Sequence, residues 1–251
     1  MKEQVRMGLA LLVTSILTTG CIQMEHDLQI QTSGAAVYRL DYTITEQAIT
    51  QFRALLKLRA DLAHAADAAP DPHLHPILQT LIDPSVSAIR EHAQGLATYG
   101  ISIRNLREAP RAHGRQFSIT LDIENIQRLS EIPFFSQYGF SLQQNAEGQY
   151  VLERSAIVDE PGSLPARFSE QELGNIRPLL AGFRSEIRIQ VPGRILSTTA
   201  GRTAMQTATW IFDFDRQPEA LHELLRQRFH LVFHAPQVDL PAVTLGDKPK
   251  R

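Results

Sequence analysis

The sequence predicts an α+β protein, with antiparallel sheet built from hairpins and with helices packed on one face of that sheet. Apolar and polar residues alternate with a period of two in neighbouring pairs of segments, and turn residues separate the two members of each pair. Apolar stripes at helical spacing are grouped between these pairs, which favours α+β over a doubly wound parallel sheet. The 251 residues are 43% hydrophobic and 21% charged, so most of the chain is expected to bury a core.

The first predicted hairpin occupies residues 24–44. Leu28 and Ile30 alternate before turn residues at 32–34, and the second strand repeats the alternation through Tyr38, Leu40, Tyr42 and Ile44. Thr45 is suited to cap a following helix. The apolar stripe expected on that helix consists of Ala48, Ile49, Phe52, Leu55, Leu56 and Leu62.

The central part of the chain predicts a second helix followed by two strands. Asp83-Pro84 is typical of a helix start, and Gly100 suits the residue just after a helix end. One strand is expected from Ile101, and the clearest half-buried strand follows at 117–123, with a loop at 110–114 between them. A short helix is then expected over 125–132.

The remaining elements follow the same pattern of hairpins and short helices. The turn residues 145–148 predict another hairpin, and residues 159–166 have the composition of a linker. The further elements expected are a helix from Ser169 through Phe183, strands around 187–191, 195–196 and 210–214, a helix from Pro218, and a last strand with Leu231 and Phe233.

The predicted organisation is a mature region at 21–234 with a tail on either side of it. The mature region is either one domain or two subdomains, 24–155 and 169–234. Residues 235–251 are rich in proline and charge, which predicts a disordered tail.

The N-terminus is typical of a processing signal. Lys2 and Arg6 precede an apolar run at 7–17, which is too short for the ~20 residues of a membrane-spanning helix but suits the ~7–15 residues of a signal peptide. Small residues follow up to Gly20, and Cys21 is the only cysteine of the chain. The sequence therefore predicts a signal peptide over 1–20, cleaved between Gly20 and Cys21.

This segment resembles the lipobox of bacterial lipoproteins, in which a small residue precedes a cysteine that becomes lipidated. The family prefers leucine three residues before the cysteine, whereas here Leu17 stands four before it and Thr18 takes the preferred place. The resemblance implies lipidation of Cys21 with several acyl chains, and two or more chains give stable membrane attachment. Since Ile22 rather than aspartate follows, the resemblance also implies the outer membrane and a periplasmic orientation.

A second resemblance is to the LppM-like group of bacterial lipoproteins. It rests on Cys21, then Asp27-Leu28 with a glycine turn and a long second strand, and on Gln190–Arg194 followed by Thr209–Asp213, where a proline-glycine turn precedes a strand with tryptophan. The resemblance implies a membrane-anchored envelope protein without assigned enzymatic activity. Proteins of this group often end in a membrane helix, for which this chain has no segment.

The sequence carries none of the motifs of nucleotide-binding loops or serine-hydrolase elbows, so no cofactor is predicted. The net charge of −2 and the lack of a basic block exclude the usual footprint of nucleic-acid binding. Two sets of histidine and aspartate are candidates for a metal site. His73 and His75, with Asp67 and Asp71 nearby, fit a solvated loop better than a metal site with its need for a third ligand.

The alternative to a non-catalytic protein is an envelope hydrolase or metal-dependent enzyme that uses residues near 213–234. His230 and His234 would share one face of a strand, as would Asp213 and Asp215. Exposed polar residues of a sheet are the simpler interpretation. The same holds for Asp122 and Glu124, which alternate with apolar residues, and for the polar turn at 198–202.

Aromatic residues supply the remaining candidates for a ligand or partner contact. Trp210 is one member of an aromatic set that also contains Phe212, Phe214 and Phe233; the set favours a core, or else the lining of an apolar ligand site. Phe134 and Phe135 stand next to each other in a non-periodic stretch, where one can be exposed to a partner or a membrane. The sequence thus predicts a non-catalytic envelope lipoprotein that binds or scaffolds a lipid, protein or envelope component.

Overall fold

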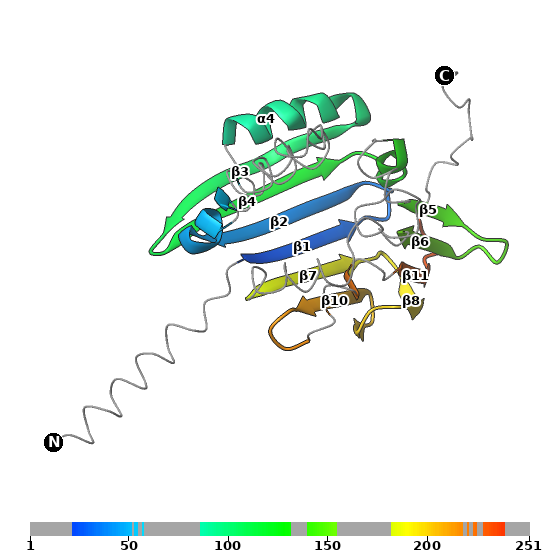
Figure 1. Cartoon of the computed structure of the whole chain (residues 1–251). Coiled ribbons are helices and arrows are strands. Elements are labelled where there is room, and N and C mark those ends of the chain that lie inside the picture. The colour runs from blue at the N-terminus through cyan, green and yellow to red at the C-terminus, as the bar shows by residue number, and fades with distance from the viewer. Residues whose placement is uncertain are drawn as a thin grey trace, which may run out of the picture.

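The computed structural model describes residues 22–51, 86–131, 140–154, 182–217 and 228–238, together with positions 53, 54, 57, 220, 223 and 224. Within these residues the chain forms two β-sheets, one large and one small, and the small sheet lies toward one end of the large one (Figure 1). The candidate site described below belongs to the large sheet.

The large sheet has seven strands in the order β3-β4-β2-β1-β7-β10-β9. Neighbouring strands are antiparallel except β1 and β7, which run parallel. The strands are β1 (Ile22–Ile30), β2 (Ala36–Thr45), β3 (Ile101–Arg111), β4 (Gly114–Ile123), β7 (Phe183–Gln190), β9 (Arg202–Ala204) and β10 (Thr207–Asp213).

The small sheet has four antiparallel strands in the order β5-β6-β11-β8. Its strands are β5 (Ser141–Gln144), β6 (Tyr150–Arg154), β8 (Arg194–Thr198) and β11 (Phe229–His234). Both sheets therefore combine strands from the region 24–155 with strands from the region 169–234.

The prediction of an α+β fold is wrong, because the described part of the chain is mainly β. Its one continuous α-helix is α4 (Val86–Gly95), which runs into the short 3₁₀ helix η1 (Leu96–Tyr99); η2 (Ile126–Glu131) is also 3₁₀. The error has a physical source in strand length. Long strands with many charged outward positions, such as β3, show little apolar alternation and so predict short strands plus loops, and the described residues therefore contain more strand than the sequence pattern indicates.

Two local differences illustrate this. The loop expected at 110–114 is mostly strand, since β3 continues through Pro110 to Arg111. Because β3 is an edge strand, a proline without an N–H is tolerated there. Phe183, expected at the end of a helix, instead begins β7 and pairs with Ile22.

Several predicted details are confirmed. The hairpin expected at 24–44 is present as β1 and β2, and the turn residue Gly34 has a φ of 80°. The Thr45 hydroxyl accepts a hydrogen bond from the Ala48 N–H at 3.2 Å, so Thr45 caps the helical residues that begin at Glu46. Gly100 ends the η1 segment in the left-handed conformation, with a φ of 72°.

The large sheet has one apolar face and one polar face. Along β1 the apolar positions are the even-numbered ones, and the register carries this face across the sheet through side chains such as Tyr42, Phe117 and Trp210. Near Ile22 this face is covered by the helix after β2 and by α4, whereas at the other end it packs with the small sheet. Between them these contacts bury the aromatic residues that form the core.

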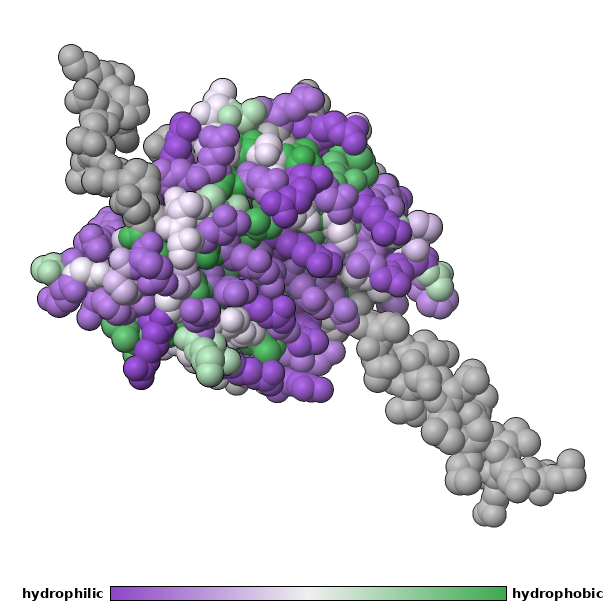
Figure 2. Space-filling model, turned by 180° about the vertical axis from the view of Figure 1, so that it is seen from behind, coloured by the Kyte–Doolittle hydropathy of each residue, from purple (hydrophilic) through white to green (hydrophobic). Residues whose placement is uncertain are grey.

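The opposite face of the large sheet carries mostly charged and polar side chains. It includes Gln23, Glu25 and Asp27 on β1, Arg39 and Asp41 on β2, Ser118 and Asp122 on β4, and Glu186 and Arg188 on β7. Figure 2 looks at the molecule from this side, where hydrophilic residues gather over the middle.

The predicted tail is described only at its first residues. Ala235 and Val238 are buried, and the Val238 carbonyl accepts a hydrogen bond from the Tyr150 hydroxyl at 2.9 Å. Residues 239–251 lie outside the described residues.

Candidate functional site: a basic hollow on the polar face

Several of the residues singled out from the sequence lie outside the described part of the chain. This holds for Gly20 and Cys21 at the predicted cleavage site, for Phe134 and Phe135, and for the loop with His73 and His75. No helix among the described residues is both long and apolar enough to cross a membrane.

Trp210, proposed from the sequence as a ligand or partner contact, is only 1% exposed and belongs to the core. Its ring meets that of Phe229 edge-on at 4.9 Å between centroids, and its indole N–H donates to the Thr199 hydroxyl at 3.4 Å. The same hydroxyl donates to the Arg228 carbonyl and accepts from the His230 N–H. The polar turn at 198–202 therefore ties the two sheets together.

The histidines and aspartates of the enzyme alternative lie on different sheets. His230 is on β11 of the small sheet, where its Nδ1 lies 2.9 Å from Glu153 Oε1. Asp213 is on β10 of the large sheet and accepts from the Arg216 N–H, and Asp215 accepts from the Gly182 N–H at 2.7 Å. Within the described ranges no three metal-ligating side chains come together.

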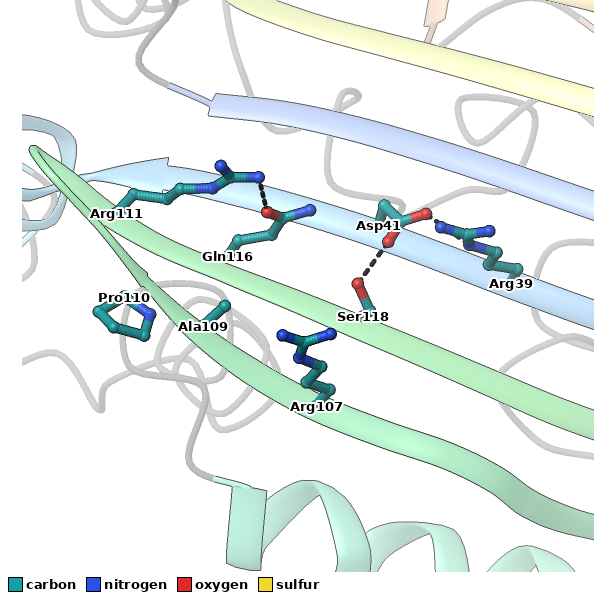
Figure 3. A pocket seen from close by; sticks show the side chains of 8 residues that line it. All are labelled: Arg39, Asp41, Arg107, Ala109, Pro110, Arg111, Gln116 and Ser118. Carbon is teal, nitrogen blue, oxygen red and sulfur yellow. Dashed lines mark hydrogen bonds and ion pairs between the residues drawn. The ribbon is translucent and has the colours of Figure 1, made fainter.

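A hollow with a volume of about 370 Å³ lies on the polar face, over β2, β3 and β4 (Figure 3). Small-molecule sites usually enclose ~300–1,000 Å³. The lining residues are Arg39, Asp41, Arg107, Ala109, Pro110, Arg111, Gln116 and Ser118. All come from consecutive neighbours in the sheet, so the strand pairing fixes their relative positions.

The single carboxylate of the hollow is already engaged. Asp41 Oδ2 lies 2.6 Å from Arg39 Nε, and Asp41 Oδ1 accepts a hydrogen bond from the Ser118 hydroxyl at 2.5 Å. Figure 3 shows this carboxylate between the two side chains. The charge of Asp41 is therefore balanced by Arg39 and is further satisfied by Ser118.

The two other arginines have no anionic partner there. Arg111 bonds to the neutral amide oxygen of Gln116, and Arg107 has neither an ion pair nor a hydrogen bond within the described residues. In Figure 3 the Arg107 guanidinium points from β3 toward the middle of the hollow. The hollow therefore carries an excess of positive charge, and its lining residues are held by three hydrogen-bonded strands.

The neighbouring part of the same face has the opposite sign. A smaller hollow of about 140 Å³ is lined by Glu25, His26, Asp27, Arg39, Asp41, Glu186 and Arg188. Arg188 makes ion pairs with both Asp27 and Glu186, at 3.3 Å and 2.8 Å. Carboxylates outnumber arginines here, so the polar face divides into a basic region over β2–β4 and an acidic region over β1 and β7.

A partly buried polar pair on β1 and β2 lies at this boundary, on the opposite face of the sheet. His26 Nδ1 and the Tyr38 hydroxyl are 2.7 Å apart. Burial lowers the pKa of His26 to about 4, and the positive charge of Arg154 acts in the same direction. Burial also raises the pKa of Tyr38. Both groups are therefore neutral near pH 7.

The hollow was missed from the sequence although its positions follow a visible rule. Arg39 and Asp41 are the outward positions of a strand whose inward positions were recognised, and Ser118 alternates in the same way with Phe117 and Ile119. The missing information was the register across β2, β4 and β3. Without it, Arg107 and Arg111 belong to an apparent loop and cannot be placed beside Asp41.

Comparison with known proteins gives similarity of structure and none of sequence. No family model matches the chain, and no curated protein sequence matches it. Among solved structures, the chain is similar to the folded domain of LppM from Mycobacterium tuberculosis, with 8% sequence identity and a TM-score of 0.41; the alignment covers 88% of this chain and 95% of that one. The likeness is distant, and no residue is matched through it.

Proposed function

We propose that this protein is a lipoprotein of the bacterial cell envelope, anchored through Cys21, that acts by binding rather than by catalysis. The observation that carries the proposal is the position of β1 in the sequence. Its described strand, Ile22–Ile30, includes the residue next to Cys21, and Ile22 is 6% exposed within the core next to Ile44 and Phe117. A lipid on Cys21 would hold the folded sheet at the membrane with no spacer between them.

The binding role is supported by the polar face of the large sheet. It joins a basic hollow and an acidic one on the surface of a single sheet, and strands fixed by hydrogen bonds hold functional groups more precisely than loops do. An envelope lipid, protein or polymer is the class of partner that an anchored protein would meet. Placement in the outer membrane, facing the periplasm, is part of the proposal and rests on Ile22 after the cysteine.

The test is the intact mass of the full chain extracted from bacterial membranes, beside a Cys21→Ala variant. We expect the wild-type product to begin at Cys21 and to carry a diacylglyceryl group and a further acyl chain. The variant, which lacks the thiol that forms the thioether, should show no acyl mass. A wild-type product without acyl mass would overturn the proposal.

A further inference from the structure

We propose that the basic hollow binds the phosphate group of anionic phospholipids in the membrane that carries the protein, with Arg107 and Arg111 as the phosphate ligands. This deepens the proposed function and rests on it for the identity of the membrane. Three observations carry the inference: the uncompensated charge of the hollow, its position relative to residue 22, and the geometry of its donors.

The charge of the hollow favours an anion. Three arginines and one aspartate line it, and the aspartate is held by Arg39 and Ser118. Arg111 contacts only a neutral amide, and Arg107 has no partner within the part of the chain that the structure describes. Guanidinium groups match phosphate oxygens through paired N–H donors, which makes arginine the usual residue for such recognition.

The position of the hollow places it at the end of the sheet where β1 begins. Ile22 pairs with Ile44, and the next residue, Thr45, pairs with Gly114, which in turn pairs with Arg111. Three strand spacings separate β1 from β3, which corresponds to roughly 15 Å. In Figure 1 the start of β1, the end of β2 and the tip of the β3–β4 hairpin all lie at the same end of the sheet.

The hairpin tip is held firmly to this end. The Glu46 N–H donates to the His113 carbonyl at 3.0 Å, which joins the tip to the start of the helix after β2. A Cβ at Gly114 would lie 2.1 Å from the Ile44 carbonyl oxygen, so only glycine permits the close approach of β4 to β2. Arg111 is therefore presented by a fixed edge rather than by a free loop.

Arg107 and Arg111 lie at different distances from the anchored end of the sheet. Arg107 lies four residues before Arg111 on the same face of β3, which is roughly 13 Å along an extended strand. If the sheet is anchored at residue 21 and tilts so that its polar face approaches the membrane, both side chains reach the phosphate groups of the lipids. The acidic region over β1 and β7 then lies beside the basic one, and the repulsion between its carboxylates and the phosphates limits the inclination.

The experiment measures binding to vesicles and uses the full chain with Cys21→Ala, so that its result does not depend on acylation. The probe is phosphatidylcholine vesicles with or without phosphatidylglycerol, and the readout is the ratio of the two partition coefficients. Residues 1–20 contribute equally in every variant compared. The test variant is Arg107→Gln with Arg111→Gln, and the matched control is Arg194→Gln, an exposed arginine of β8 in the small sheet.

We expect the preference for anionic vesicles to fall roughly 5-fold for one arginine and roughly 25-fold for both, since a basic residue near an anionic surface contributes about that much. Arg194→Gln should leave the preference unchanged. Arg107→Lys with Arg111→Lys should retain part of it, because the charge remains but the paired donors do not. Circular dichroism and urea unfolding check that all variants fold.

Two results would overturn the inference. One is an unchanged preference for anionic vesicles in a folded double glutamine variant. The other is saturable binding of inorganic phosphate, lost in that variant, with no preference for anionic vesicles in the parent chain, which would assign the hollow to a soluble anion. Because acylation is read by mass on the wild-type chain, either result leaves the lipoprotein proposal to be judged separately.

Discussion

The two faces of the large sheet are made by alternate residues of the same strands, yet they differ in almost every physical respect. On β4, Phe117 is 1% exposed in the core, while Ser118, the next residue, opens into the basic hollow and bonds to Asp41. Burial constrains the first face, because every side chain there must fit its neighbours. The second face meets no such demand, so its charges are free to be arranged for binding.

The largest expected difference between the faces is in stability. Phe117→Ala should lower the free energy of unfolding by about 3–5 kcal/mol, because it removes a fully buried ring and leaves a cavity among Ile22, Tyr42 and Ile44. Thr120→Ala, three residues later on the polar face of β4, should change it by less than about 0.5 kcal/mol. Urea unfolding followed by the fluorescence of Trp210, the only tryptophan, measures both. Similar losses for the two variants would show that the polar face is also packed.

A smaller expected effect is the pH dependence of the free energy of unfolding that His26 causes. The pKa of His26 is lowered by burial from 6.5 to about 4, so the unfolded chain binds a proton there between these pH values while the folded chain does not. The free energy of unfolding should therefore fall as pH falls through this window, by about 2 kcal/mol between about pH 7 and about pH 5. At higher pH both states are neutral at His26, and its contribution is fully present.

The control for this pH dependence is His26→Gln, which keeps a hydrogen-bonding side chain beside Tyr38 but does not titrate. Subtracting its pH profile from that of the parent isolates His26 from the carboxylates that titrate in the same range. Identical profiles for parent and variant would contradict the assignment of a buried neutral imidazole to the inner side of the sheet.

The contrast between the faces also explains how far the sequence could be interpreted. Apolar alternation located β1, β2 and β4 and the later hairpins, because burial selects residue types on the inner face. The same rule failed on β3, where Pro110 and several arginines sit in an edge strand with few buried positions. Strands of this kind predict loops, so the sequence pattern indicates less strand than the protein contains.

The candidate site was harder to predict than the fold for a related reason. Its residues share no sequence motif, and what brings them together is pairing across three strands that are separated along the chain. Asp41 and Ser118, which are hydrogen-bonded on neighbouring strands, are 77 residues apart in the sequence. The parallel pairing of β1 with β7 is also a long-range contact, and no local pattern at Phe183 indicates it.

The smallest expected effect lies within the polar face itself. Arg104 and Asp122 form a two-point ion pair across β3 and β4, with side chains 55% and 38% exposed. Water and salt screen such a pair, so Asp122→Asn should cost between about 0 and 1 kcal/mol of the free energy of unfolding. A double-mutant cycle with Arg104→Gln, followed by urea unfolding, isolates the coupling between the two side chains.

A coupling of several kcal/mol would mean that the ion pairs of this face hold the sheet together, and the face would then be a structural surface rather than one available for binding. A small coupling keeps the distinction between a face that stabilises the fold and a face whose charges remain free to meet a partner.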